Sequence, residues 1–390
     1  MPDSVATKVS YLKTIPDVKA LVCDQQLHLE MLEYPRRTTS FPRMHPEVDN
    51  DPANNASFPF NFNPVGMARH LLRSKSTVAS MHGADSLHQA GFRGEGIRVA
   101  VFDTGIHKEH RSFKNLKERS NWTNEKILDD VLGHGTFVAG VIGSSSATCP
   151  GFAPSAEIYT FRVFNSKQIS YTSWFLDAFN YALHLQPHII NLSIGGPDFG
   201  DQPFVEKVNE LSNAGITLIS AVGNDGPLWG TVNNPADQWD VIGVGGLATG
   251  GGLAPFSSRG MSLWELPAMG RIKPDITTYA TGIWGPSTQV GGESCREMSG
   301  TSAATPIVTG GLALLLSTLP HQQRAQLIQP GLLKQLTHAS ATLQRDLSYF
   351  EQGAGLLDLQ RGSQWLQSFT PHLSAFPPHF IMGGDTSSSA

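Results

Sequence analysis

Four residues of this chain have side chains that together could break an acyl bond: Asp103, His134, Asn224 and Ser302. A serine hydroxyl is a weak nucleophile until an adjacent base removes its proton, and histidine suits this role because its pKa lies near neutrality. A buried aspartate holds the imidazole in one tautomer and stabilises its charged form. A carboxamide can stabilise the oxyanion that forms. The residue types therefore predict serine catalysis, with Ser302 as nucleophile, His134 as base and acid, Asp103 as its orienting partner and Asn224 as oxyanion donor.

Asp103 and Asn224 each follow an apolar run that is typical of a buried strand. Asp103 comes directly after residues 97–102, and Asn224 follows residues 216–222 with one glycine between. The carboxyl ends of parallel strands gather at one edge of an α/β sheet, where active sites usually lie. We therefore expect these two side chains at the same edge.

His134 and Ser302 lie where helices are expected to begin. Residues 134–143 and 302–319 read as helices, the second almost wholly apolar, and Pro306 sits in the first turns of that helix, where a missing backbone donor costs little. The backbone N–H groups at a helix start are unpaired and favour negative charge. The Ser302 amide is therefore the expected second oxyanion donor.

Strand and helix patterns alternate along the chain from about residue 96. The expected strands are 97–102, 157–163, 188–192, 216–222 and 241–244, and the expected helices are 134–143, 171–185, 205–214 and 302–319. Short apolar strands alternating with helices predict the α/β class, with a central, mostly parallel sheet covered by helices on both faces. Around it we expect an N-terminal extension at 1–72 and a catalytic domain at 73–370. Residues 371–390 are expected to be a tail or the start of a truncated C-terminal region.

Composition excludes several classes of protein. The 390 residues are 40% hydrophobic and include 39 glycines, which argues against a disordered chain or a coiled coil. The net charge of −5 argues against a nucleic-acid binder driven by bulk positive charge. Three cysteines are too few for a disulfide scaffold. From these residues we expect neither a transmembrane span nor a signal peptide in this sequence.

The residues around three of the candidates resemble the signature motifs of subtilases. These are residues 99–105 (VAVFDTG), 133–140 (GHGTFVAG) and 300–306 (GTSAATP), in the order Asp, His, Ser. The resemblance covers about residues 84–366. It implies a subtilisin-like three-layer fold preceded by a pro-segment, serine endopeptidase activity (a hydrolase of peptide bonds), and the catalytic roles given above.

Longer blocks are similar to one branch of this family, the site-1 proteases. The blocks are residues 113–119, 121–125, 161–164, 171–182, 191–199, 223–228 and 256–261. This resemblance implies a zymogen in the endoplasmic reticulum or Golgi lumen. Its implied substrates are luminal segments of membrane-anchored precursors, such as those of sterol-regulatory transcription factors.

The resemblance also gives the N-terminal region a role. Residues 69–72 (RHLL) have the Arg-x-(aliphatic)-Leu form that such enzymes cleave, so we predict autocleavage after Leu72, with Arg69 as the recognised cation. Residues 1–72 would then be a pro-segment that inhibits its own enzyme. The alternative is a helix face that carries an arginine by chance.

Subtilases bind substrate as an added extended strand. By resemblance, one side of the cleft is formed by Ser193, Ile194 and Gly195, and the other by Gln168, Ile169 and Ser170. Asp198 and Asp201 are candidates for meeting the substrate arginine, although solvated loop carboxylates are the simpler interpretation.

A calcium ion is implied by the family, but the sequence names no ligands. Residues 144–149 (SSSATC) are shorter than the calcium loop of bacterial subtilisins and lack carboxylates. Cys149 and Cys295 flank elements of the site, and whether they pair stays open. His107 and His110 lie near Asp103 in the sequence, and we expect both at the surface.

The motifs of two other classes of hydrolase are absent from the sequence. An aspartic protease needs a second Asp-Thr-Gly or Asp-Ser-Gly motif, and the sequence has none. An α/β-hydrolase needs a Gly-x-Ser-x-Gly motif and triad residues in the order Ser, Asp, His, whereas here residue 304 is Ala and the order is Asp, His, Ser. A catalytically inactive binding scaffold and a subtilase of different specificity are the remaining alternatives.

Overall fold

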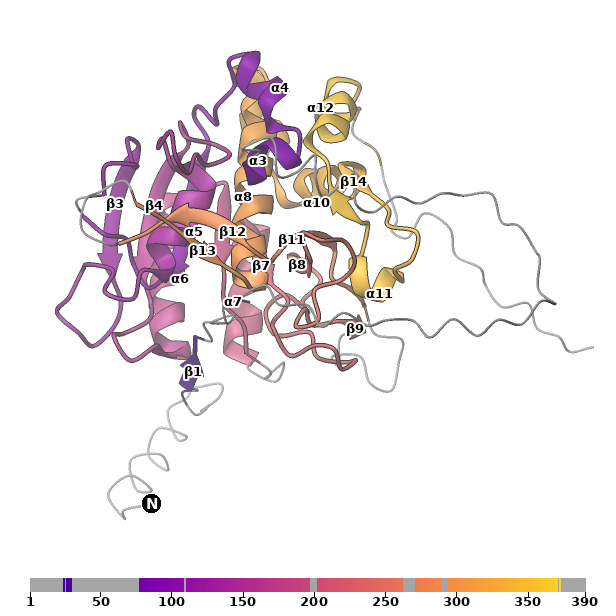
Figure 1. The fold of residues 1–390 in the computed structure, drawn as a ribbon. Helices are drawn as coiled ribbons and strands as arrows, with labels where there is room; N and C mark the ends of the chain where they lie inside the picture. Colours follow the sequence, from indigo (N-terminus) through magenta and orange to yellow (C-terminus); the bar gives the residue numbers. More distant parts are fainter. Residues whose placement is uncertain are drawn as a thin grey trace, which may run out of the picture.

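The computed structural model describes residues 24, 26–29, 77–108, 110–196, 202–261, 271–288, 294–370 and 372. A nine-stranded sheet crosses the molecule in the order β14-β15-β11-β8-β7-β6-β2-β4-β3 (Figure 1). Its strands are β2 (Arg98–Asp103), β3 (Leu116–Asn121), β4 (Glu157–Arg162), β6 (Ile189–Leu192), β7 (Thr217–Ala221), β8 (Val241–Leu247), β11 (Ile276–Tyr279), β14 (Ala341–Thr342) and β15 (Leu356–Leu357). Every neighbouring pair is parallel except β14 with β15. The predicted α/β class with a mostly parallel sheet is confirmed.

Helices cover both faces of this sheet. The described helices are α3 (Val78–Met81), α4 (Ala84–Gln89), α5 (His134–Gly143), α6 (Thr172–Leu185), α7 (Gln202–Asn213), α8 (Thr301–Ser317), α9 (His321–Leu327), α10 (Pro330–Ala339), α11 (Tyr349–Gln352) and α12 (Leu359–Gln367). Helices α5 and α8 pack together on one face, and α6 and α7 on the other. The result is the three-layer arrangement that the sequence predicts.

Strand β2 shows why a strand between two helical layers reads as an unbroken apolar run. Val99 and Val101 pack into the layer that contains α5 and α8. Ala100 and Phe102 point the other way, into the layer that contains α6 and α7. Because successive side chains of a strand alternate between faces, both sets must be apolar when both faces are covered.

The central helix α8 is buried along its whole length. A Cβ atom added at Gly310 would lie 2.8 Å from Phe152 Cβ and 3.1 Å from Ile142 Cα, which is too close for a side chain. Gly310 therefore lets α8 approach α5 closely. The first turns of these two helices carry the candidate residues Ser302 and His134.

All nine predicted strands and helices are present, with ends that differ by at most a few residues. Strand β3 was not predicted, because its sequence LKERSN is polar and its side chains are largely half-buried at the sheet edge. Three small antiparallel pairs were not predicted either. They are β1 (Gln26–His28) with β5 (Ile169–Tyr171), β9 (Gly260–Met261) with β10 (Ile272–Lys273), and β12 (Ile283–Pro286) with β13 (Cys295–Met298).

The proposed domain boundaries at 72/73 and 370/371 fall on or beside residues outside the described ranges. Of the N-terminal extension, the structure describes only residues 24 and 26–29, and strand β1 lies far in sequence from the next element, α3 (Figure 1). Within the described ranges, no helix combines the length and the apolar character needed to cross a membrane.

Candidate active site

Asp103 and His134 form a buried pair at the carboxyl edge of the sheet. Asp103 is the last residue of β2, and His134 is the first residue of α5. The distance from His134 Nδ1 to Asp103 Oδ1 is 2.7 Å, and the Thr104 backbone N–H donates to the same oxygen at 2.8 Å. Because Nδ1 faces a carboxylate oxygen, it carries the ring hydrogen and leaves Nε2 as the basic nitrogen.

Two glycines allow the turn that brings His134 to Asp103. Gly133 precedes α5 with φ of 80°, a left-handed conformation that favours glycine. At Gly135 an added Cβ would lie 2.1 Å from the carbonyl oxygen of Gly105, so no side chain fits there. The Gly-His-Gly sequence is therefore required by the close approach of α5 to the loop after β2.

Ser302 and Asn224 form the second pair. Asn224 follows β7, and its Oδ1 accepts hydrogen bonds from Thr301 N at 2.9 Å and from Thr301 Oγ1 at 3.1 Å. These bonds occupy the carboxamide oxygen and leave the Nδ2 hydrogens free to point elsewhere. Ser302 is the second residue of α8, so its backbone N–H has no acceptor within the helix.

A cavity of about 250 Å³ joins the second pair to one predicted side of the cleft. Its walls include Ser302, Asn224, Ser193, Ile194, Gly195 and residues 26–29 of the N-terminal segment. Asp103 and His134 are not among its lining residues. The structure thus brings Ser302 and Asn224 together with residues 193–195.

His134 Nε2 is buried and has no hydrogen-bond partner among the described residues, and the same is true of Asp103 Oδ2. No hydrogen bond from Ser302 to His134 is therefore present in the described part of the chain. The packing of α5 against α8 nevertheless places the first turns of both helices in the same layer. Catalytic hydrogen bonds are often long without substrate and tighten when it binds.

The other predicted side of the cleft carries a strand. Residues 169–171 form β5, and β1 pairs with it antiparallel: Leu27 lies opposite Ser170, and His28 lies opposite Ile169. The Leu29 backbone N–H then donates to the Gln168 carbonyl at 3.0 Å. This edge therefore accepts an extended chain through backbone hydrogen bonds.

Side chains of the N-terminal segment alternate between solvent and protein. Gln26 and His28 are exposed, whereas Leu27 is half-buried and Leu29 is 5% exposed, and both leucines pack on the apolar layer that includes Ile194. Asp24 anchors the segment, because its carboxylate accepts from the Ser173 N–H at 2.9 Å in the first turn of α6. An anion is favoured there by the helix dipole.

Four other sequence candidates lie outside the described residues: Arg69, Leu72, Asp198 and Asp201. Their predicted roles stay predictions.

The segment after α5, residues 144–149, does not carry the carboxylate ligands that calcium prefers. Ser146 Oγ bonds to Thr148 Oγ1 at 2.8 Å, and Ser146 N donates to Ser144 Oγ at 3.1 Å, so these polar groups satisfy one another. No carboxylate lies in this segment. Across the described ranges, no group of three or more His, Cys, Asp or Glu side chains is placed to hold a metal ion.

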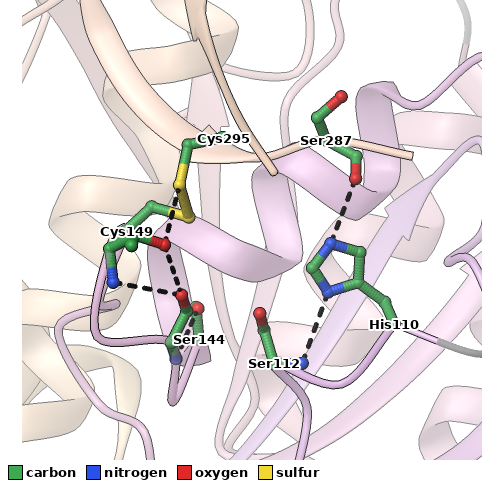
Figure 2. The surroundings of a disulfide bond; sticks show 8 residues. His110, Ser112, Ser144, Cys149, Ser287 and Cys295 are labelled. Atoms are coloured by element: carbon green, nitrogen blue, oxygen red, sulfur yellow. Dashed lines mark hydrogen bonds between the residues drawn. A yellow bond between two sulfur atoms is a disulfide. The ribbon is translucent and has the colours of Figure 1, made fainter. Parts of the chain in front are cut away.

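Cys149 and Cys295 form a disulfide between the segment after α5 and the first residue of β13 (Figure 2). The pairing that the sequence left open is thus present. It connects the region after the His134 helix to the strand that leads into the Ser302 helix.

His110 is buried, contrary to the sequence expectation. It is 5% exposed, its Nε2 lies 3.1 Å from the Ser287 carbonyl oxygen, and the Ser112 N–H approaches its Nδ1 at 3.4 Å (Figure 2). Ser287 directly follows β12, and this contact between distant segments has no local signal in the sequence. His107 is partly exposed, as expected.

Two charged residues beside the Asp103–His134 pair were missed by the sequence analysis. Asp130 is buried below the start of α5, and burial raises its pKa although several donors oppose that shift. Arg296 Nη2 donates to the Gly133 carbonyl at 2.8 Å. Burial lowers the pKa of the Arg296 guanidinium, and the charges of Asp130 and Asp103 act against this. A carboxylate shortly before a helix is a common capping pattern, so the sequence held no specific signal for Asp130.

Comparison with known proteins gives the same family as the motifs. Residues 94–355 match the profile of the subtilase family. Subtilisin E of Bacillus subtilis is 32% identical over 287 residues, which are 72% of this chain and 69% of that protein.

Two proteins that are longer than this chain share a higher sequence identity with it than subtilisin E does. Membrane-bound transcription factor site-1 protease of Mus musculus is 54% identical over 314 residues, which are 80% of this chain and 29% of that protein. Subtilisin-like protease SBT6.1 of Arabidopsis thaliana is 52% identical over 314 residues, 30% of its length. The chain thus spans about 30% of the length of these relatives.

Proposed function

The chain belongs to the subtilase family of serine endopeptidases, and from that premise we propose that it is a peptidase of the site-1 type. One observation carries the proposal. The segment Gln26 to Leu29 lies as an added strand on β5, and it lines the cavity that Ser302 and Asn224 also line. A site that holds an extended chain beside a serine hydroxyl suits hydrolysis of an extended peptide.

In this mechanism Ser302 Oγ attacks the carbonyl carbon of the scissile bond while its proton passes to His134 Nε2. Nε2 is the basic nitrogen because Nδ1 carries the hydrogen that faces Asp103, 2.7 Å away. The carboxylate of Asp103 then stabilises the imidazolium. That imidazolium returns the proton to the leaving amine, and a water molecule repeats both steps to release the acyl group.

The negative charge of the tetrahedral intermediate needs two donors. Asn224 Nδ2 is available because Thr301 holds Oδ1 at 2.9 Å and so fixes the orientation of the carboxamide. The Ser302 backbone N–H supplies the second donor from the first turn of α8, where the helix dipole adds to it.

Substrate binds as an extended strand between residues 168–170 and residues 193–195. Backbone bonds of the kind that Leu29 N–H makes to Gln168 would hold its main chain. We propose the Arg-x-(aliphatic)-Leu preference of the site-1 type, and luminal segments of membrane-anchored transcription factor precursors as substrates in the secretory pathway. The similarity to site-1 protease supports both points.

The N-terminal region acts as a pro-segment that inhibits its own enzyme, and we propose that it is released by self-cleavage after Leu72. The position of β1 supports the inhibitory role, because a strand that occupies β5 denies that edge to a substrate. The catalytic domain then extends from residue 73 to about residue 370.

Expression of the chain beside a Ser302→Ala variant tests the proposal. We expect the unaltered chain to react covalently with a fluorophosphonate and to show a new N-terminus at Arg73, and the variant to do neither. A correctly folded chain that never reacts would support the binding-scaffold alternative. If the chain reacts and both forms gain the same N-terminus, peptidase activity stands and self-cleavage is wrong.

A further inference from the structure

Asp130 is a buried carboxylate that the mechanism above does not use. It lies between β3 and α5, it is 2% exposed, and its two oxygens accept five hydrogen bonds. We propose that Asp130 is a positioning residue, which fixes Asp103 and His134 relative to one another for the peptidase reaction. This inference rests on the proposed function.

One oxygen connects the loop after Asp103 to the turn before His134. Asp130 Oδ1 accepts from Thr104 Oγ1 at 2.8 Å, and Thr104 directly follows Asp103. The same oxygen accepts from Gly133 N at 2.8 Å and from Leu132 N at 3.1 Å. This one oxygen therefore binds both Thr104, which follows Asp103, and Gly133, which precedes His134.

The other oxygen holds the first turn of α5. Asp130 Oδ2 accepts from Thr136 N at 2.8 Å and from Thr136 Oγ1 at 2.6 Å. Gly133 and Thr136 lie on either side of His134, so the carboxylate fixes the backbone on both sides of the imidazole. It also satisfies N–H groups that a helix start otherwise leaves unpaired.

Thr104 closes the network. Its hydroxyl donates to Asp130 and accepts from the Gly135 N–H at 2.8 Å, while its own N–H donates to Asp103 Oδ1 at 2.8 Å. Asp103 and His134 are thus connected by these hydrogen bonds as well as by their direct contact. A shift of either residue would break bonds at the shared carboxylate.

Only a deprotonated carboxylate can accept all five bonds, so Asp130 brings a negative charge close to the imidazole. The charges of Asp130 and Asp103 both raise the pKa of the Arg296 guanidinium on β13, against the larger effect of burial. Asp130→Asn removes the Asp130 charge and puts an N–H donor where one acceptor oxygen stood, so it breaks the bonds that oxygen accepts.

The test compares Asp130→Asn with Asp129→Asn, a neighbour whose side chain is 42% exposed, in the full chain. Cleavage of a peptide of residues 66–75 gives kcat and KM, and the rate of fluorophosphonate labelling reports Ser302 reactivity without a peptide. We expect Asp130→Asn to lower kcat by about 10²-fold with little change in KM, as misplacement of catalytic groups does. We expect Asp129→Asn to behave as the unaltered chain.

Thr104→Val provides a second variant that removes one hydroxyl and leaves the buried carboxylate in place. If Asp130 acts through Thr104, the two substitutions together cost less than the sum of their separate effects. Circular dichroism measures the folded fraction of every variant. A folded Asp130→Asn chain with an unchanged kcat overturns the positioning role, and separate effects that simply add overturn its action through Thr104. An unaltered chain that neither cleaves nor labels would instead reject the proposed function.

Discussion

Thr301 donates two hydrogen bonds to the Asn224 carboxamide oxygen, one from its backbone N–H at 2.9 Å and one from its hydroxyl at 3.1 Å. Thr301 is also the first residue of the helix that carries Ser302. The proposed nucleophile and the proposed oxyanion donor are therefore held together through one intervening residue. This relationship makes the orientation of Asn224 testable separately from its presence.

Asn224→Ala should lower kcat by about 10²–10³-fold, a magnitude that comes from subtilisin itself. Thr301→Val removes only the hydroxyl that orients the carboxamide, and we expect a smaller loss. Steady-state cleavage of a peptide measures both, with fluorophosphonate labelling as a check on Ser302. An Asn224→Ala chain with an unchanged kcat would remove this residue from the mechanism.

Leu29→Asp should speed labelling of the intact chain by about tenfold or more, because a carboxylate would be buried without a partner when β1 lies on β5. Gln26→Asp is the matched control, since Gln26 is exposed on the same segment. The rate of reaction with a fluorophosphonate before any cleavage is the measurement. Equal rates for the two variants would argue against inhibition by this strand.

Replacement of Cys149 and Cys295 by serine should lower the free energy of unfolding. The disulfide joins residues 146 apart. If the disulfide acts by lowering the entropy of the unfolded chain, a link across so long a loop adds about 5 kcal/mol to the free energy of unfolding. Urea unfolding measures the change, and Cys23→Ser is the control. A stability equal to that of the control would show that the link contributes nothing.

His82 should make the protein less stable as the pH falls. Burial lowers the pKa of His82 to about 4, and its ring lies between the Leu357 carbonyl at 2.8 Å and the Thr278 hydroxyl at 2.7 Å. Below its ordinary pKa of 6.5, the unfolded chain binds a proton that the folded chain refuses. Stability is therefore lost between pH 6.5 and 4, by about 3 kcal/mol.

Urea unfolding of His82→Gln across this pH range checks the prediction, and His321→Gln is the control because His321 is exposed. The slope of unfolding free energy against pH should be smaller in His82→Gln. An identical slope in all three proteins would assign the acid sensitivity to other groups.

Local sequence patterns were enough to predict the layers of the fold and the four catalytic candidates. Residues 97–102 form an apolar run because β2 is covered on both faces, and such a run is visible without any knowledge of its neighbours. Asp103 and His134 follow from the same local patterns, since each adjoins the end of a strand or the start of a helix. The family motifs then gave these positions their expected chemistry.

Contacts between segments far apart in the sequence became visible only in the folded molecule. Nothing local marks Gln26–His28 as the partner of β5, Cys149 as the partner of Cys295, or His110 as a buried residue. Asp130 reads as an ordinary carboxylate before a helix, and its five bonds exist because the loop after β2 and the start of α5 fold against it. The hydrophobic periodicity of a segment indicates which of its faces is buried. The contacts named here depend instead on how the layers pack, because that packing brings together segments far apart in the chain.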